Sequence, residues 1–147
     1  MSDEHPTTAL VSKLIRFLST DGLSVEDVCA RIGAIAEDPG GLLPIKLRSV
    51  MPGVETARLF RYPVTGWPYL VEIDLAIDAR LEVGALEKLL GTGHPARTDR
   101  GMPAEVLFHP PGENPAWQMV VIAGLQSASG PQVVSRIAFR RDPTDEA

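Results

Sequence analysis

Two arginines and a histidine lie close together in the least regular stretch of the chain. Residues 91–103 show no hydrophobic period, and the side chains there that can bind or titrate are His94, Arg97, Asp99 and Arg100. Arginine can bind a carboxylate or a phosphate through two parallel hydrogen bonds. The stretch therefore predicts a site for an anionic ligand, with His94 as acid or base. The alternative is a solvated surface loop whose charges keep the chain soluble.

A second group of residues combines arginines with aromatic rings. Its members are Arg58, Arg61, Tyr62, Trp67, Tyr69 and Trp117. Tyrosine, tryptophan and arginine carry much of the binding energy at protein interfaces. The group therefore predicts a surface for a protein partner, although an ordinary pair of strands with aromatic residues at its rim would have the same composition.

Glu72 and Asp74 stand two residues apart, so on a strand they point to the same face. Paired carboxylates at this spacing suit acid–base chemistry or a divalent cation. The commoner interpretation is the solvated face of an antiparallel sheet. If helices covered that face, the two carboxylates would instead be buried charges.

The remaining candidates form no recognisable catalytic or metal motif. His94 and His109 fall in predicted loops, where they could converge with Asp99 or Glu105, but metal sites usually show tighter ligand spacing. There is no Gly-x-Ser-x-Gly motif, and the single cysteine, Cys29, falls on the apolar stripe of a predicted helix. We therefore expect Cys29 to be a small buried hydrophobic residue, and we predict neither a metal nor a cofactor.

Composition narrows the classes of partner. The chain has 147 residues and a net charge of −5. An acidic chain lacks the attraction to phosphate backbones that drives nucleic-acid binding. Its longest apolar runs are far shorter than the ~20 residues of a membrane span. We expect a single cytoplasmic domain over residues 1–147, with flexible ends at 1–6 and 142–147, that binds neither nucleic acid nor membrane.

Two amphipathic helices begin the predicted fold. Over residues 7–20 the apolar side chains follow the helical i, i+3, i+4, i+7 spacing. Over residues 24–37 they do so again, with Ser24 as the N-cap. The turn at Asp21-Gly22 joins the two into an αα-hairpin, whose apolar faces must pack on something else.

A third helix is predicted over residues 79–90, capped by Asp78 and ended by Gly91. The other regular segments have the alternation of strands, which is clearest at 69–75. These predicted strands cover about 45–49, 58–62, 69–75, 104–109, 117–125 and 132–140.

The last two predicted strands differ in their faces. In 117–125 both faces are largely apolar, which indicates a strand buried on both sides. In 132–140 the residues Arg136 and Arg140 face outward, and Arg141 follows the end of the strand.

Together these elements predict an α+β fold. It has an N-terminal αα-hairpin, a mainly antiparallel sheet of five or six strands with helices on one face, and one helix inserted between the two halves of the sheet. We expect a small non-enzymatic protein-interaction module that binds a partner protein, or a second copy of itself, through the sheet and its hairpin loops. The alternative is a small-molecule site, binding or enzymatic, formed by the 91–103 loop and the sheet.

Overall fold

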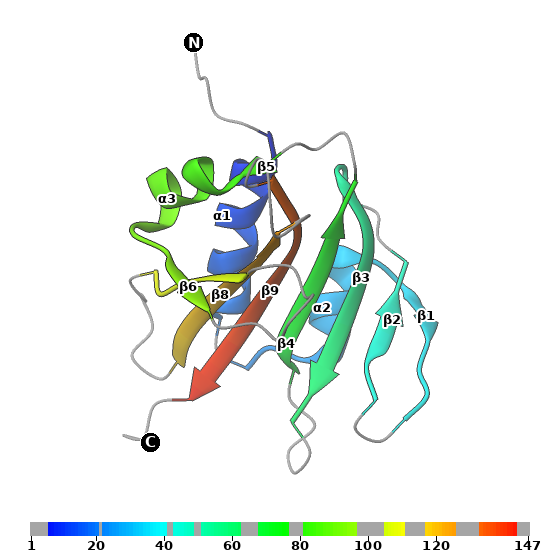
Figure 1. Cartoon of the computed structure of the whole chain (residues 1–147). Helices are drawn as coiled ribbons and strands as arrows, with labels where there is room; N and C mark the ends of the chain where they lie inside the picture. Colours follow the sequence, from blue (N-terminus) through cyan, green and yellow to red (C-terminus); the bar gives the residue numbers. More distant parts are fainter. Residues whose placement is uncertain are drawn as a thin grey trace.

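An antiparallel sheet forms the main layer of the structure (Figure 1). The computed structural model describes residues 6–20, 22–40, 43–48, 51–62, 68–76, 81–96, 105–110, 117–125 and 133–143. The strands in these residues are β1 (Ile35–Glu37), β2 (Ile45–Leu47), β3 (Val54–Arg61), β4 (Pro68–Leu75), β5 (Leu81–Glu82), β6 (His94–Ala96), β7 (Glu105–Phe108), β8 (Trp117–Leu125) and β9 (Val133–Pro143). The predicted class, α+β with an antiparallel sheet, is confirmed.

The strand order is β1-β2-β3-β4-β9-β8-β7-β6, and β5 pairs with β9 beyond the end of the β4 pairing. The described residues therefore contain nine strands, where the sequence predicted five or six. β9 includes Asp142 and Pro143, the first two residues of the end predicted to be flexible. The rest of that end lies outside the described residues.

The three helices of the described chain pack on one face of the sheet. They are α1 (Pro6–Leu18), α2 (Val25–Ile32) and α3 (Val83–Leu90), and α1 and α2 lie behind the strands in Figure 1. Val11, Leu14 and Leu18 of α1 are buried in the same core as Ile73 of β4 and Phe139 of β9. α1 and α2 thus cover one face of the sheet, whereas the placement of the helices differs from the prediction.

The helix predicted over 24–37 is half as long in the structure. Its start is as expected, because Ser24 and Asp27 form a reciprocal capping box with hydrogen bonds of 3.0 and 3.1 Å. The hydrogen bond from the Ser24 backbone lowers the pKa of Asp27. The helix ends at Ile32, and Ile35–Glu37 pair with β2 as an edge strand. Apolar spacing continues past Ile32, but Ile35 is 47% exposed, so no packing holds that turn as helix.

The third predicted helix, in contrast, starts later than expected. Leu81 and Glu82 form β5, in which the fully buried Leu81 pairs with Val134 of β9, and the helix begins at Val83. The predicted cap Asp78 lies outside the described residues. The predicted stop is correct, because Gly91 has φ +94° and its N–H donates to the Glu87 carbonyl at 2.9 Å.

A short strand, β6, forms inside the stretch predicted to be an irregular loop. The chain enters it through Gly93, where an added Cβ would lie 2.5 Å from Val106 and 2.9 Å from Phe108. Only glycine allows the backbone to pass so close to these two buried side chains. This close approach positions His94 opposite Leu107 of β7.

Arg141 was predicted to follow the last strand, but it lies within β9. Its side chain points to the core side of the sheet, and only 2% of the residue is exposed. Its Nη1 donates to the Pro68 carbonyl at 2.9 Å and its Nη2 to the Thr20 carbonyl at 3.2 Å. One guanidinium thus joins β9 to the start of β4 and to the end of the first helical segment. Burial of an arginine is tolerated because backbone carbonyls accept its hydrogen bonds.

We expect Arg141→Ala to lower the free energy of unfolding by about 2–4 kcal/mol, because it leaves two inward carbonyls without their charged donor. The adjacent Arg140→Ala is the matched control. Arg140 lies on the other face, with a side chain 38% exposed and paired with Asp142, so its loss should cost under ~1 kcal/mol. Urea unfolding of both variants measures the difference, and equal losses would contradict the role given to Arg141.

Candidate functional site

The face of the sheet opposite the helices combines charged and apolar side chains. In its four central strands this helix-free face consists of Thr56, Arg58, Phe60, Leu70, Glu72, Asp74, Gln118, Val120, Ile122, Gly124, Arg136, Ala138, Arg140 and Asp142. The alternation of each strand places these residues away from the core.

A charge cluster occupies the middle of the helix-free face. The Nε of Arg58 donates to Glu72 Oε1 at 2.9 Å, its Nη2 also contacts that oxygen, and its Nη1 lies 3.0 Å from Asp74 Oδ2. Thr56 Oγ1 donates to the same Asp74 oxygen. Arg136 approaches Glu72 from β9 at 3.8 Å. Glu72 and Asp74 are therefore on one face, as predicted, and neighbouring strands supply their cations.

The cluster is partly withdrawn from water, since the side chains of Arg58 and Glu72 are only 26% and 19% exposed. Burial alone would lower the pKa of Arg58, but its hydrogen bonds to Glu72 and Asp74 and their negative charges outweigh burial and raise that pKa. The guanidinium therefore stays charged and holds both carboxylates in place. This arrangement suits ionic pairing across the sheet better than proton transfer, because Arg58 does not release a proton near neutral pH.

Apolar residues surround the charges. Val120 of β8 and Ala138 of β9 are 2% and 7% exposed, although both belong to the helix-free face and neither joins the main core. Phe60, Leu70 and Ile122 beside them are half-buried. The prediction that 117–125 is apolar and buried on both sides is thus correct for its middle residues, while Gln118 at its start is exposed.

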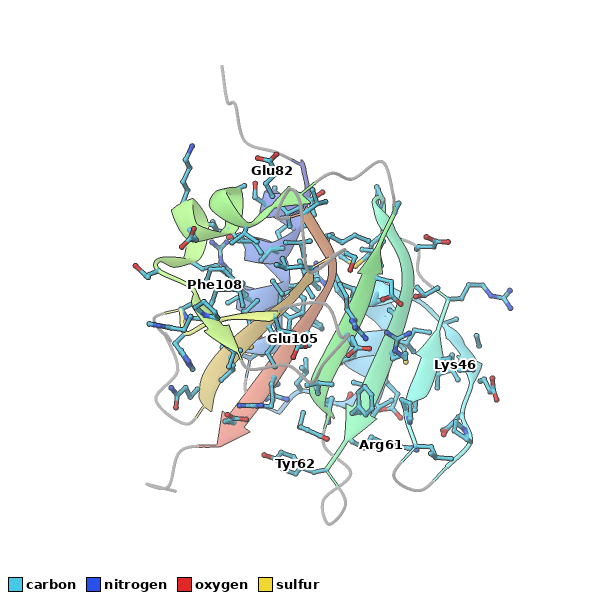
Figure 2. The ribbon with its side chains drawn as sticks, in the orientation of Figure 1. Lys46, Arg61, Tyr62, Glu82, Glu105 and Phe108 are labelled. Carbon is cyan, nitrogen blue, oxygen red and sulfur yellow. The ribbon has the colours of Figure 1, made fainter. Side chains whose placement is uncertain are left out.

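The residues of the predicted arginine–aromatic group do not form one cluster. The arginines form ion pairs with carboxylates, and the two tyrosines contact each other. Arg58 belongs to the charge cluster, and Arg61 Nη2 lies 3.1 Å from Asp38 Oδ1. Tyr62 and Tyr69 pack together, with ring centroids 4.8 Å apart. Figure 2 shows Arg61 and Tyr62 side by side at the lower end of β3. Trp67 lies outside the described residues, and the backbone of Trp117 begins β8.

The two histidines that sequence analysis left as a possible pair do approach each other. His94 in β6 and His109 after β7 are both exposed, and their ring centroids are 6.3 Å apart. The antiparallel pairing of His94 with Leu107 places His109 on the same side of β7. Arg97, Asp99 and Arg100 lie outside the described residues. Among the residues that are described, no three histidine, cysteine or acidic side chains gather as metal ligands would.

His94 and the charge cluster do not belong to one site. Three strands, β9, β8 and β7, separate β4 from β6 in the sheet order. At ~4.8 Å per strand this is about 19 Å. The edge of the sheet and its centre are therefore distinct candidate sites.

Cys29 packs partly against the core, as expected for a small hydrophobic residue. Burial, with a smaller contribution from Glu26, raises the pKa of its thiol. The thiolate is the reactive form of cysteine, so the surroundings of Cys29 disfavour nucleophilic chemistry.

Sequence analysis did not identify the apolar residues of the helix-free face, or the residues that β9 contributes to it, as parts of a candidate functional site. The outward position of Arg136 and Arg140 was predicted, but not their nearness to Glu72 and Asp142. The available signal was that outward positions in the strands hold Phe60, Leu70 and Ile122 as well as charges. A fully solvated face would carry mainly polar residues there.

Comparison of the chain with protein-family models, with curated proteins and with solved structures gave no match. None of the helices in the described part of the chain combines the length and the apolar character needed to cross a membrane. The site must therefore be interpreted from its own geometry.

We expect Tyr62 to titrate above its ordinary value of 10.0, because burial and the nearby Asp142 raise its pKa. The chain has two tyrosines, so Tyr69→Phe leaves Tyr62 as the single phenol seen by ultraviolet absorbance. A folded-state pKa above the unfolded one stabilises the fold below pH ~10, and this contribution is lost as the pH rises through the folded-state pKa. Titration of the folded and the urea-unfolded variant compares the two pKa values, and identical values would contradict the expectation.

Proposed function

We propose that the chain is a non-enzymatic protein-interaction module whose docking surface is the helix-free face. The observation that supports this most is the mixture on that face of half-buried apolar side chains with cross-paired charges. Interface centres are enriched in arginine and aromatic residues and depleted in lysine, glutamate and aspartate. The central strands match this pattern in their cations, Arg58, Arg136 and Arg140, and in Phe60, whereas their carboxylates depart from it and are paired with these arginines.

The internal pairing of the charges also favours docking of a protein surface. A charge that is already paired and hydrogen-bonded loses less on dehydration than a bare one. Arg58, Glu72 and Asp74 hold one another in place, so a partner that covers them need not supply a counter-ion for each. Tyr62, whose phenol lies near Asp142 and Arg140 and whose ring packs on Tyr69, would extend the same surface, and rigid tyrosine rings are favourable contact residues.

Site-specific photo-crosslinking in living cells tests the proposal. A photoreactive p-benzoylphenylalanine replaces Gln118, which lies on the helix-free face and is exposed. The matched control places the same residue at the exposed Lys88 on α3. We expect discrete adducts, identified by mass spectrometry, from position 118 but not from position 88. The absence of adducts at 118, or the same adducts at both positions, would contradict the proposal.

A small-molecule site at the β6–β7 edge is the second candidate, favoured by the 6.3 Å approach of the His94 and His109 rings. Two imidazoles whose ring N–H groups both donate hydrogen bonds to the same acceptor can bind an anion such as phosphate. Titration with inorganic phosphate, followed by NMR of the histidine ring protons, should then move both resonances along one saturable curve. His94→Gln should abolish the response of His109. Shifts that stay linear with concentration would exclude this candidate.

A further inference from the structure

The charges of the helix-free face cancel, whereas those of the whole chain do not. In its four central strands the face has three cations, Arg58, Arg136 and Arg140, and three anions, Glu72, Asp74 and Asp142. The chain as a whole carries −5. Two copies therefore repel each other in general, but not through this face. A strongly acidic or basic partner gains no net attraction from it either.

In one row of the helix-free face the charges are complementary under a two-fold rotation. The acidic pair Glu72 and Asp74 is on β4, and the basic pair Arg136 and Arg140 is on the adjacent β9. A two-fold axis parallel to the strands and between β4 and β9 would place β4 of one copy over β9 of the other. Since Asp74 is level with Arg136 in the register, each Asp74 would then face Arg136 of the second copy. A two-fold interface forms this contact twice.

The apolar residues follow the same symmetry. Phe60 on β3, Leu70 on β4, Arg140 on β9 and Val120 on β8 form one row across the sheet. The axis that pairs Asp74 with Arg136 brings Leu70 of one copy over the aliphatic part of Arg140 of the other. Phe60 lies over the β8 end of this row, where Val120 itself is 2% exposed and already buried within its own chain. Two sheets packed face to face lie ~10 Å apart with interdigitated side chains, so these residues would fill the space on one side of the charge row.

We infer that the helix-free face is a self-association surface, on which two copies of the chain pack face to face about a two-fold axis between β4 and β9. This inference rests on the proposed function and names the partner of the same surface. Arg136 is the central contact, since it has the largest exposed fraction of the six charged side chains, 44%, and lies 3.8 Å from its carboxylate neighbour Glu72.

Sedimentation velocity over about 1–200 µM protein tests the inference. The wild type should shift with concentration toward twice the 15.9 kDa mass of one chain. Arg136→Glu should weaken the dimer by about 10- to 100-fold, because the like charges meet twice in the interface. Lys88→Glu makes the same change of charge on α3, away from the face, and should leave the dissociation constant unchanged. Ile122→Asp changes an apolar position on the same face and is a second variant that should weaken the dimer. Circular dichroism confirms that each variant folds.

The outcomes separate the inference from the proposed function. A wild type that remains monomeric throughout, or equal dissociation constants for Arg136→Glu and Lys88→Glu, overturns self-association. If the protein is monomeric but position 118 still crosslinks to a different protein in cells, the self-association inference fails and the interaction module stands. If it is monomeric and position 118 gives no adduct, both fail.

Discussion

Backbone pairing of β9 with both β4 and β8 is the interaction on which the whole sheet depends. β3 and β4 form one antiparallel hairpin, β7 and β8 form another, and neither hairpin touches the other through hydrogen bonds. β9 lies between them and satisfies the backbone groups of both inner edges. Buried backbone groups without partners are costly, so the two halves of the sheet become one layer only when β9 is in place.

The alternation of β9 then divides the chemistry of the molecule between two faces. Ile137, Phe139 and Arg141 point to the helices, and Arg136, Ala138 and Arg140 point away. On the helix side burial of β9 is nearly complete, and Arg141, the one charged side chain that the described residues of β9 place there, is anchored on carbonyls from two other segments. On the other side the charges find carboxylates on the same face. A shift of register by one residue would exchange the two faces, so the buried Arg141 also fixes the register.

Periodicity was enough to predict most of the elements. The long helix at the start and the strands around 69–75 and 117–125 follow from apolar spacing alone, because burial imposes that spacing. The predicted element boundaries were wrong where the apolar spacing continues a helix but the packing of the folded chain does not support it. Ile35 continues the helical pattern of α2 but has no core to face, and Leu81 fits the helical pattern of α3 but is buried by pairing with β9. Short strands such as β6 have too few residues to show a period.

The candidate site was harder to predict, since it consists of contacts between strands distant in sequence. Arg58 and Glu72, or His94 and His109, come together through the register, which no local pattern encodes. The position of β9 also has a consequence for synthesis. A ribosome delivers β9 after every other described strand, so β4 and β8 leave it with exposed inner edges. A chain that stops short of residue 133 would leave the inner edges of β4 and β8 unpaired at the same time. Degradation of such truncated chains by proteases would protect the cell from aggregates.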